Sequence, residues 1–212
     1  MLETLTLSTD HIFIFITFIM ISWTGLFILC SVLSPALCCD WLRHYGHYSN
    51  ISLTLIRLMG GQLTEEESPV SFPYKLYKHI RNTEVGSQVV FIRDSLVQIS
   101  DLYRHDNLSF VTWDTDNTNR FRMSIDRQID SLNTCCFCFQ VRTNKQVDNS
   151  LRNYYRRLRA RTLNRTGGSP GSWELIRKET QLHLEQLDLL VNSIRPSAAA
   201  SRRSSTTSQQ QL

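Results

Sequence analysis

The residues in this chain that could form covalent bonds are its six cysteines, which fall into two groups. Three lie near the N-terminus and three lie much further along, namely Cys30, Cys38, Cys39, Cys135, Cys136 and Cys138. In an oxidising compartment this distribution predicts one disulfide between the groups, from Cys39 to Cys135 or to its neighbour Cys136. Closing a loop of about a hundred residues should stabilise the fold by roughly 4–5 kcal/mol.

The second cysteine group could instead supply thiolate ligands to a metal. A structural zinc site needs four ligands, with Cys or His pairs at characteristic spacing. Here two of the three cysteines are adjacent, and the nearest histidines in sequence are His105 and His183. We therefore expect no metal and no cofactor. The sequence contains no phosphate loop and no recognisable catalytic motif, so we expect no catalytic site and no enzyme activity.

The N-terminal cysteines follow a long uncharged segment. Residues 12–33 form an apolar run of about 22 residues, and Pro35 and small residues follow it. This pattern predicts a signal peptide at residues 1–38, cleaved after Cys38, and a secreted protein that is not inserted in a membrane afterwards. Two alternatives remain open, an uncleaved signal anchor and a start at Met20. Each of these readings places the rest of the chain outside the cytosol.

Composition and sequons agree with an extracellular domain. Three Asn-x-Ser/Thr triplets predict glycosylation at Asn50, Asn107 and Asn164. The two charges of the leader are acidic, so the mature part has 23 basic and 17 acidic side chains and a net charge of +6. This charge is moderate, and we expect no nucleic-acid partner.

The elements that must position these residues show only helical periodicity. Apolar residues recur at steps of three and four, which predicts five main helices, at about Leu42–Met59, Val89–Tyr103, Phe121–Leu132, Leu151–Leu158 and Trp173–Val191, and a short one at Tyr74–Ile80. Either Thr112 or Asp114 is expected to cap the third main helix, and Ser169 and Pro170 to begin the last. Pro196 is expected to end it. Residues 196–212 are predicted to be a disordered tail.

The lengths of the connections favour one arrangement of these helices. The first two main helices are joined by roughly 25 residues, and a moderately long polar segment joins the third and fourth, whereas bundle connections usually have about two to eight residues. Long connections allow consecutive helices to lie parallel. We therefore predict an all-α, up-up-down-down bundle of the cytokine type in one domain, residues 39–195.

Six arginines near the fourth main helix form the densest charge run of the chain, namely Arg152, Arg156, Arg157, Arg159, Arg161 and Arg165. Leu151, Tyr154, Tyr155 and Leu158 give the same helix an apolar face, so most of the arginines lie on the other side. Such a face is usually just solvated. It could also contact an acidic protein surface or a sulfated glycan.

Several segments resemble the fish type I interferons, specifically their two-cysteine group. The matching segments are Cys39-Asp-Trp-Leu-Arg-His-Tyr, Leu58-Met-Gly-Gly, Val70-Ser-Phe-Pro-Tyr-Lys-Leu-Tyr, Asp126-Arg-Gln, Leu132-Asn-Thr-Cys135, Tyr154-Tyr-Arg-Arg-Leu and Trp173-Glu-Leu-Ile-Arg-Lys. The order and spacing of these segments carry the resemblance, which spans residues 39 to about 195.

The resemblance implies a monomeric antiviral cytokine that pairs two class II cytokine receptor chains and activates JAK-STAT signalling. It assigns the disulfide to Cys39 and Cys135 and gives Cys136 and Cys138 no role. It implies that one receptor surface comprises the first helix, the following loop and the last helix, and another the second to fourth main helices. The expected contact residues are Tyr74, Lys75, Tyr77, Arg177 and Lys178 on the first surface, and Arg156 and Arg159 on the second. Trp173 is expected in the core.

Two other functional classes compete with this one. The first is a helical protein anchored to a membrane by its uncleaved leader. The second is an arginine-rich helical protein that binds a glycan or a nucleic acid. In the chain itself, the second disulfide that many members of the family carry is missing, because Pro170-Gly171-Ser172 precedes Trp173 where those members have a cysteine.

Overall fold

A computed structural model describes residues 39–104, 108, 111–139 and 144–207. The elements of this part are α2 (Asp40–Leu58), α3 (Tyr74–Arg81), α4 (Val85–Tyr103), α5 (Thr115–Phe139), α6 (Lys145–Arg159), the π-helical turn η2 (Ala160–Asn164) and α7 (Pro170–Thr207). The predicted all-α bundle with five main helices is confirmed, and α3 is the predicted short helix. No helix of the described part combines the length and apolar character needed to cross a bilayer. The predicted leader lies outside the described residues.

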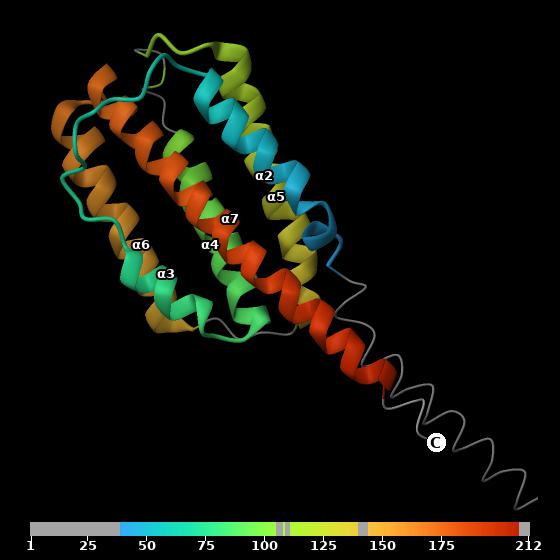
Figure 1. The fold of residues 1–212 in the computed structure, drawn as a ribbon. Helices are drawn as coiled ribbons and strands as arrows, with labels where there is room; N and C mark the ends of the chain where they lie inside the picture. Colours follow the sequence, from blue (N-terminus) through green and yellow to red (C-terminus); the bar gives the residue numbers. More distant parts are fainter. Residues whose placement is uncertain (1–38, 105–107, 109–110, 140–143, 208–212) are drawn as a thin grey trace, which may run out of the picture. The chain divides into compact units, whose positions relative to one another are not determined.

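The directions of the long helices follow the predicted order (Figure 1). The helices α2 and α4 run one way and α5 and α7 run the other way, so these four are up-up-down-down. Met59, at the end of α2, accepts a hydrogen bond of 2.7 Å from the backbone N–H of Asp114, just before α5. The fourth main helix, α6, runs parallel to α4 and packs against α4 and α3. Residues 59–73, which we call the crossover loop, make the long connection between α2 and α3.

The helix ends are set by local side chains. Asp114 caps α5, since its carboxylate accepts a hydrogen bond of 2.7 Å from the N–H of Asn117. Asn144 caps α6 in the same way, through the N–H of Gln146 at 3.0 Å. Ser169 lies before α7, and its hydroxyl accepts a bond of 3.4 Å from the N–H of Ser172.

The end of α7 differs from the expectation. The helix continues past Pro196 to Thr207, so the prediction that Pro196 ends it is wrong. A proline inside a helix removes one hydrogen bond and bends the helix, but the helix can resume beyond it. Alanines at 198–200 then favour the helical conformation. The assignment of residues 196–212 to a separate tail stays a prediction.

Aromatic side chains from several helices fill the core. The rings of Trp113 and Trp173 lie 6.0 Å apart, and Tyr103 stacks with Trp113 at 6.1 Å, which joins the end of α4 to the starts of α5 and α7. Trp173 is fully buried, as expected. At the other end of the bundle, Trp41 packs on Tyr45 within α2 at 4.8 Å.

Candidate functional site

Cys39, just before α2, forms a disulfide with Cys135 near the end of α5, where the two Cα atoms lie 4.6 Å apart. This is the pairing that the resemblance implies, and the sequence separation is 96 residues. Cys136 is a buried free thiol, and burial raises its pKa. The side chain of Cys138 lies outside the described residues.

Arg177 holds the end of α2 and the start of the crossover loop. Its buried guanidinium donates hydrogen bonds to the carbonyl oxygens of Ile56 at 3.3 Å, Arg57 at 3.4 Å and Gly61 at 2.6 Å. It also forms an ion pair of 2.8 Å with Glu174. The last carbonyl groups of a helix lack partners within the helix, and a cation there also interacts favourably with the helix dipole. Arg177 therefore serves as a C-terminal cap supplied by another helix.

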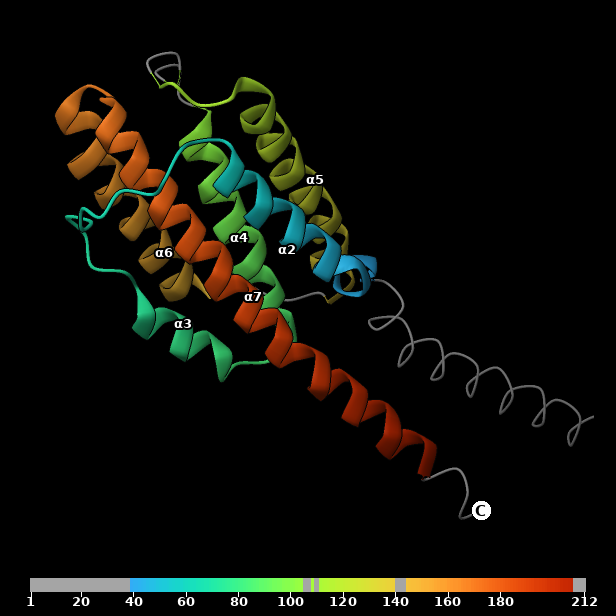
Figure 2. The ribbon, with the colours of Figure 1, turned by 45° about the horizontal axis from the view of Figure 1, so that its top comes forward.

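Two further cations hold the rest of the crossover loop. The ammonium of Lys178 donates to the carbonyl oxygen of Glu66 at 2.8 Å, and Arg161 of η2 donates to that of Pro69 at 3.1 Å. With Arg177, these contacts hold the loop at its start, middle and end as it crosses over α7 towards α6 (Figure 2). The loop thus takes a defined course between α2 and α3.

The close approach of Arg177 leaves no room for a side chain at Gly60. A Cβ atom there would lie 2.9 Å from both the guanidinium carbon of Arg177 and the ring of Trp113. We expect Gly60→Ala to lower the free energy of unfolding by about 1–3 kcal/mol, because the packing must shift. Gly61→Ala is the matched control, since a Cβ atom at Gly61 would meet nothing within 4 Å. Chemical denaturation measures both, and equal effects would contradict the proposed close packing.

The helix α3, which follows the crossover loop, is attached to α7 through the buried His183. The hydroxyl of Tyr77 lies 2.7 Å from Nδ1 of His183, and the ring of Phe72 lies 4.5 Å from the imidazole. From α6, Tyr155 stacks on the same imidazole at 4.9 Å. Burial raises the pKa of Tyr77, so its hydroxyl keeps its proton, and the direction of its hydrogen bond with Nδ1 follows the tautomer of His183. Burial also lowers the pKa of His183 from 6.5 to about 3.

This histidine should make the fold sensitive to acid. The folded pKa of His183 lies below the unfolded value of 6.5, so its contribution to stability is complete above pH 6.5 and is lost as the pH falls towards 3. The loss should be about 1.4 kcal/mol per pH unit in this window. In denaturation at pH 7 and pH 4.5, we expect the wild type to lose about 2.5 kcal/mol more than His183→Gln. His79→Gln, at an exposed position of α3, should behave as the wild type. An unchanged pH dependence in His183→Gln would contradict this account.

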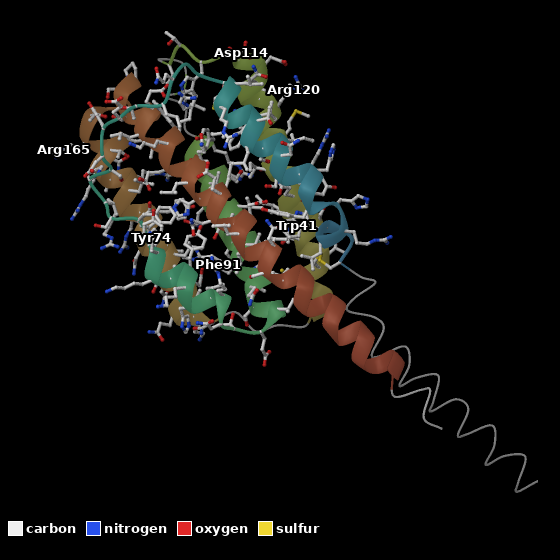
Figure 3. All side chains as sticks on the ribbon, viewed as in Figure 1. Trp41, Tyr74, Phe91, Asp114, Arg120 and Arg165 are labelled. Carbon is white, nitrogen blue, oxygen red and sulfur yellow. A yellow bond between two sulfur atoms is a disulfide. The ribbon has the colours of Figure 1, made fainter. Side chains whose placement is uncertain are left out.

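Of the residues expected to bind a receptor on the first surface, some are accessible to solvent and others are buried. Tyr74 is 57 % exposed, Lys75 is exposed, and Lys178 is half-buried against the crossover loop. Figure 3 shows Tyr74 at the start of α3. Tyr77 and Arg177 are buried and bonded as described above, so they cannot contact a receptor directly. The prediction that they contact a receptor is therefore wrong. Their role is to hold α3 and the crossover loop in place.

The arginines of α6 lie mainly on its outer side. Arg156 is exposed and donates to the side-chain oxygen of Asn153 at 2.8 Å. Arg159 donates to the carbonyl oxygen of Asp101 in α4 at 2.7 Å. Both arginines line a shallow hollow of about 300 Å³ between α4 and α6. The apolar residues of α6 that were predicted to face the core are buried.

Two of the three predicted glycosylation sites are described. Asn50 is exposed on α2, and Asn164 is exposed at the end of η2. Asn107 lies outside the described residues. No group of His, Cys, Asp or Glu within the described part could hold a metal ion.

Sequence reasoning missed the residues that hold the crossover loop. Glu174 accepts hydrogen bonds from Arg177 at 2.9 Å and from the indole of Trp113 at 2.5 Å, so it links α7 to the segment before α5. The sequence did contain one signal for the buried position of Arg177. Arg177 follows Trp173 by four residues and therefore lies on the apolar face of the helix, where a charged side chain needs a buried partner.

Comparison with known proteins gives concordant results. Residues 44–194 match the family model of the interferon alpha/beta domain. The chain is 39 % identical to interferon a3 of Oncorhynchus mykiss over 171 residues, which cover 80 % of this chain and 94 % of that protein. Among solved structures, zebrafish interferon 1 superimposes with a TM-score of 0.67 and 25 % identity, over 73 % of this chain and 99 % of that chain.

Proposed function

The chain belongs to the interferon alpha/beta family and is similar to its fish members, and from this premise we propose that it is a secreted antiviral cytokine that pairs two class II cytokine receptor chains. Members of this family are helical cytokines that bind receptors and are not enzymes. The proposal adds that pairing activates receptor-associated kinases, JAK-STAT signalling and antiviral gene expression. Cleavage of the leader after Cys38 is part of it, and N-terminal sequencing of secreted protein tests that step.

The first proposed receptor surface combines the end of α2, the crossover loop, α3 and the start of α7. Tyr74, Lys75 and Lys178 are its contact residues. An aromatic ring that is 57 % exposed and adjoins a lysine is a typical hot-spot candidate. The buried contacts of Arg177 and Tyr77 fix the loop and α3, so little conformational freedom would be lost on binding.

The second proposed surface lies on α4 and α6, around Arg156 and Arg159. In both ribbon views α7, which carries Lys178, lies in front of α4 (Figures 1 and 2). The hollow beside Arg156 and Arg159 is lined by residues of α4 and α6 and by none of α3 or α7. A ligand that pairs two receptor chains needs two such surfaces, because a ligand with one surface would occupy a single chain. The observation that carries the proposal is that an interferon bundle presents two sets of exposed or partly exposed candidate contact residues, one at α3 and the start of α7 and one at α6.

Two double variants test the pairing. We expect Tyr74→Ala/Lys75→Ala to weaken binding to one receptor chain by about 10–100-fold and to leave the other unchanged. Arg156→Ala/Arg159→Ala should do the reverse, and each variant should antagonise the wild type. Arg43→Ala/Arg120→Ala, which removes two exposed charges elsewhere, is the control. Surface plasmon resonance with each receptor ectodomain measures these affinities. Loss of both affinities in one variant, or of neither in both, would contradict the two-surface arrangement.

A further inference from the structure

An open groove lies between α2 and α5, and none of the proposed receptor-contact residues lines it. Its volume is about 560 Å³, within the range of roughly 300–1,000 Å³ for small-molecule sites. Its apolar part includes Ile51, Leu58 and Met123, and the last two are 59 % and 53 % exposed. Arg120 and Arg127 of α5 supply donors. Figure 3 shows Arg120 near the start of α5.

One wall of this groove carries a predicted glycosylation sequon. Asn50 is exposed and lines the groove, and Thr54 and Leu58 follow it at steps of four along the same face of α2. Leu58 is therefore about 12 Å further along the helix, at 1.5 Å per residue. We propose that an N-linked glycan on Asn50 lies in this groove and covers its apolar part with its first sugar rings. The proposal rests on the proposed secretion of the chain.

The chemistry of the groove suits a sugar. A pyranose ring has apolar C–H faces and a rim of hydroxyl groups, and the groove offers apolar and aromatic side chains beside hydrogen-bond donors. Tyr48 and His47, whose rings lie 6.1 Å apart, form its aromatic part, and the guanidinium of Arg120 and the amide of Asn117 can bind hydroxyls. The glycan is tethered at the wall, so its local concentration is high and weak contacts suffice.

The timing of the modification also follows from the structure. The hydroxyl of Ser52 is required in the Asn-x-Ser acceptor, and in the fold it is buried. It lies 3.1 Å from the hydroxyl of Ser124 and accepts a bond of 2.9 Å from the amide of Gln128. The glycan must therefore be attached before α2 packs against α5. Once attached, it keeps this face from contacting a receptor.

Oxidation of methionine tests the proposal. Met59 and Met123 are the only methionines after residue 38, and Met59 is buried whereas Met123 is exposed in the groove. Secreted protein from glycosylating fish cells is mapped for glycans and pulsed with hydrogen peroxide. We expect Met123 to oxidise several-fold more slowly in the glycosylated protein than in Asn50→Gln or in enzymatically deglycosylated protein. Asn164→Gln, at the second sequon that is exposed within the described residues, should keep the protection, and Met59 should react slowly in every sample.

The outcomes separate this proposal from the proposed function. A glycan on Asn50 that leaves the oxidation rate of Met123 unchanged would overturn it, and so would a secreted protein in which Asn50 is bare. A chain that is never secreted would leave all three sequons bare, which would overturn both proposals. Antiviral activity of the bare, secreted protein would leave the proposed function intact.

Discussion

Replacing Cys39 by alanine should lower the free energy of unfolding by about 4–5 kcal/mol, which is a large part of the stability of a single domain. The Cys39–Cys135 bond spans 96 residues, so it restricts the unfolded chain strongly. It also ties the start of α2 to the end of α5. Denaturation of the purified, oxidised protein measures the effect, and reduction of the wild type should reproduce it.

Two cysteine variants serve as controls for this result. Cys136→Ala keeps the disulfide and should cost less than about 1.5 kcal/mol, because only a small buried side chain is trimmed. Cys135→Ala tests whether Cys136 can form a disulfide with Cys39 in place of Cys135, and a non-reducing peptide map detects that bond. Equal stability of Cys39→Ala and the wild type would show that the disulfide does not stabilise the fold.

Replacing Arg177 by methionine should cost about 3–5 kcal/mol and release the start of the crossover loop. Methionine keeps much of the volume but removes the charge, so Glu174 loses its ion pair and the carbonyls of Ile56 and Gly61 lose their donor. Amide hydrogen exchange should then become faster in the crossover loop, and binding at the first receptor surface should weaken. Arg177→Lys should be intermediate, because an ammonium cannot form the same fork of hydrogen bonds.

The matched control for this variant is Arg57→Met. Arg57 pairs with Glu185 at 3.4 Å, but their side chains are 57 % and 40 % exposed. Solvent screening limits such a pair to less than about 1 kcal/mol. If both variants cost the same, or if the crossover loop exchanges no faster in Arg177→Met, the role assigned to Arg177 is wrong.

Much of the fold could be predicted from local sequence. Apolar residues at steps of three and four identified the core faces of the helices, including the position of Trp173. The length of the whole connection between α2 and α4, which comprises the crossover loop and α3, indicated that α2 and α4 are parallel, because only a long connection can return to the start of a parallel neighbour. The end of α7 was not predictable in this way, since the effect of Pro196 depends on its surroundings.

The candidate site was less predictable because it depends on contacts between distant segments. Tyr77 and Arg177 were expected on the surface, yet each reaches a partner more than 100 residues away, His183 for Tyr77 and Gly61 for Arg177. No local period reveals such partners. Tyr74 and Lys75 are exposed because they lie on the other side of the same short helix. Their role in receptor binding stays a prediction.

The most direct test of the account adds purified protein starting at Cys39, with its disulfide intact, to fish cells before virus challenge. We predict a dose-dependent fall in virus yield and induction of antiviral genes, with neither effect from Tyr74→Ala/Lys75→Ala at the same dose. Circular dichroism and a non-reducing peptide map first establish that both proteins are folded and oxidised. Folded, oxidised wild-type protein that gives no protection at any dose would contradict the proposed function.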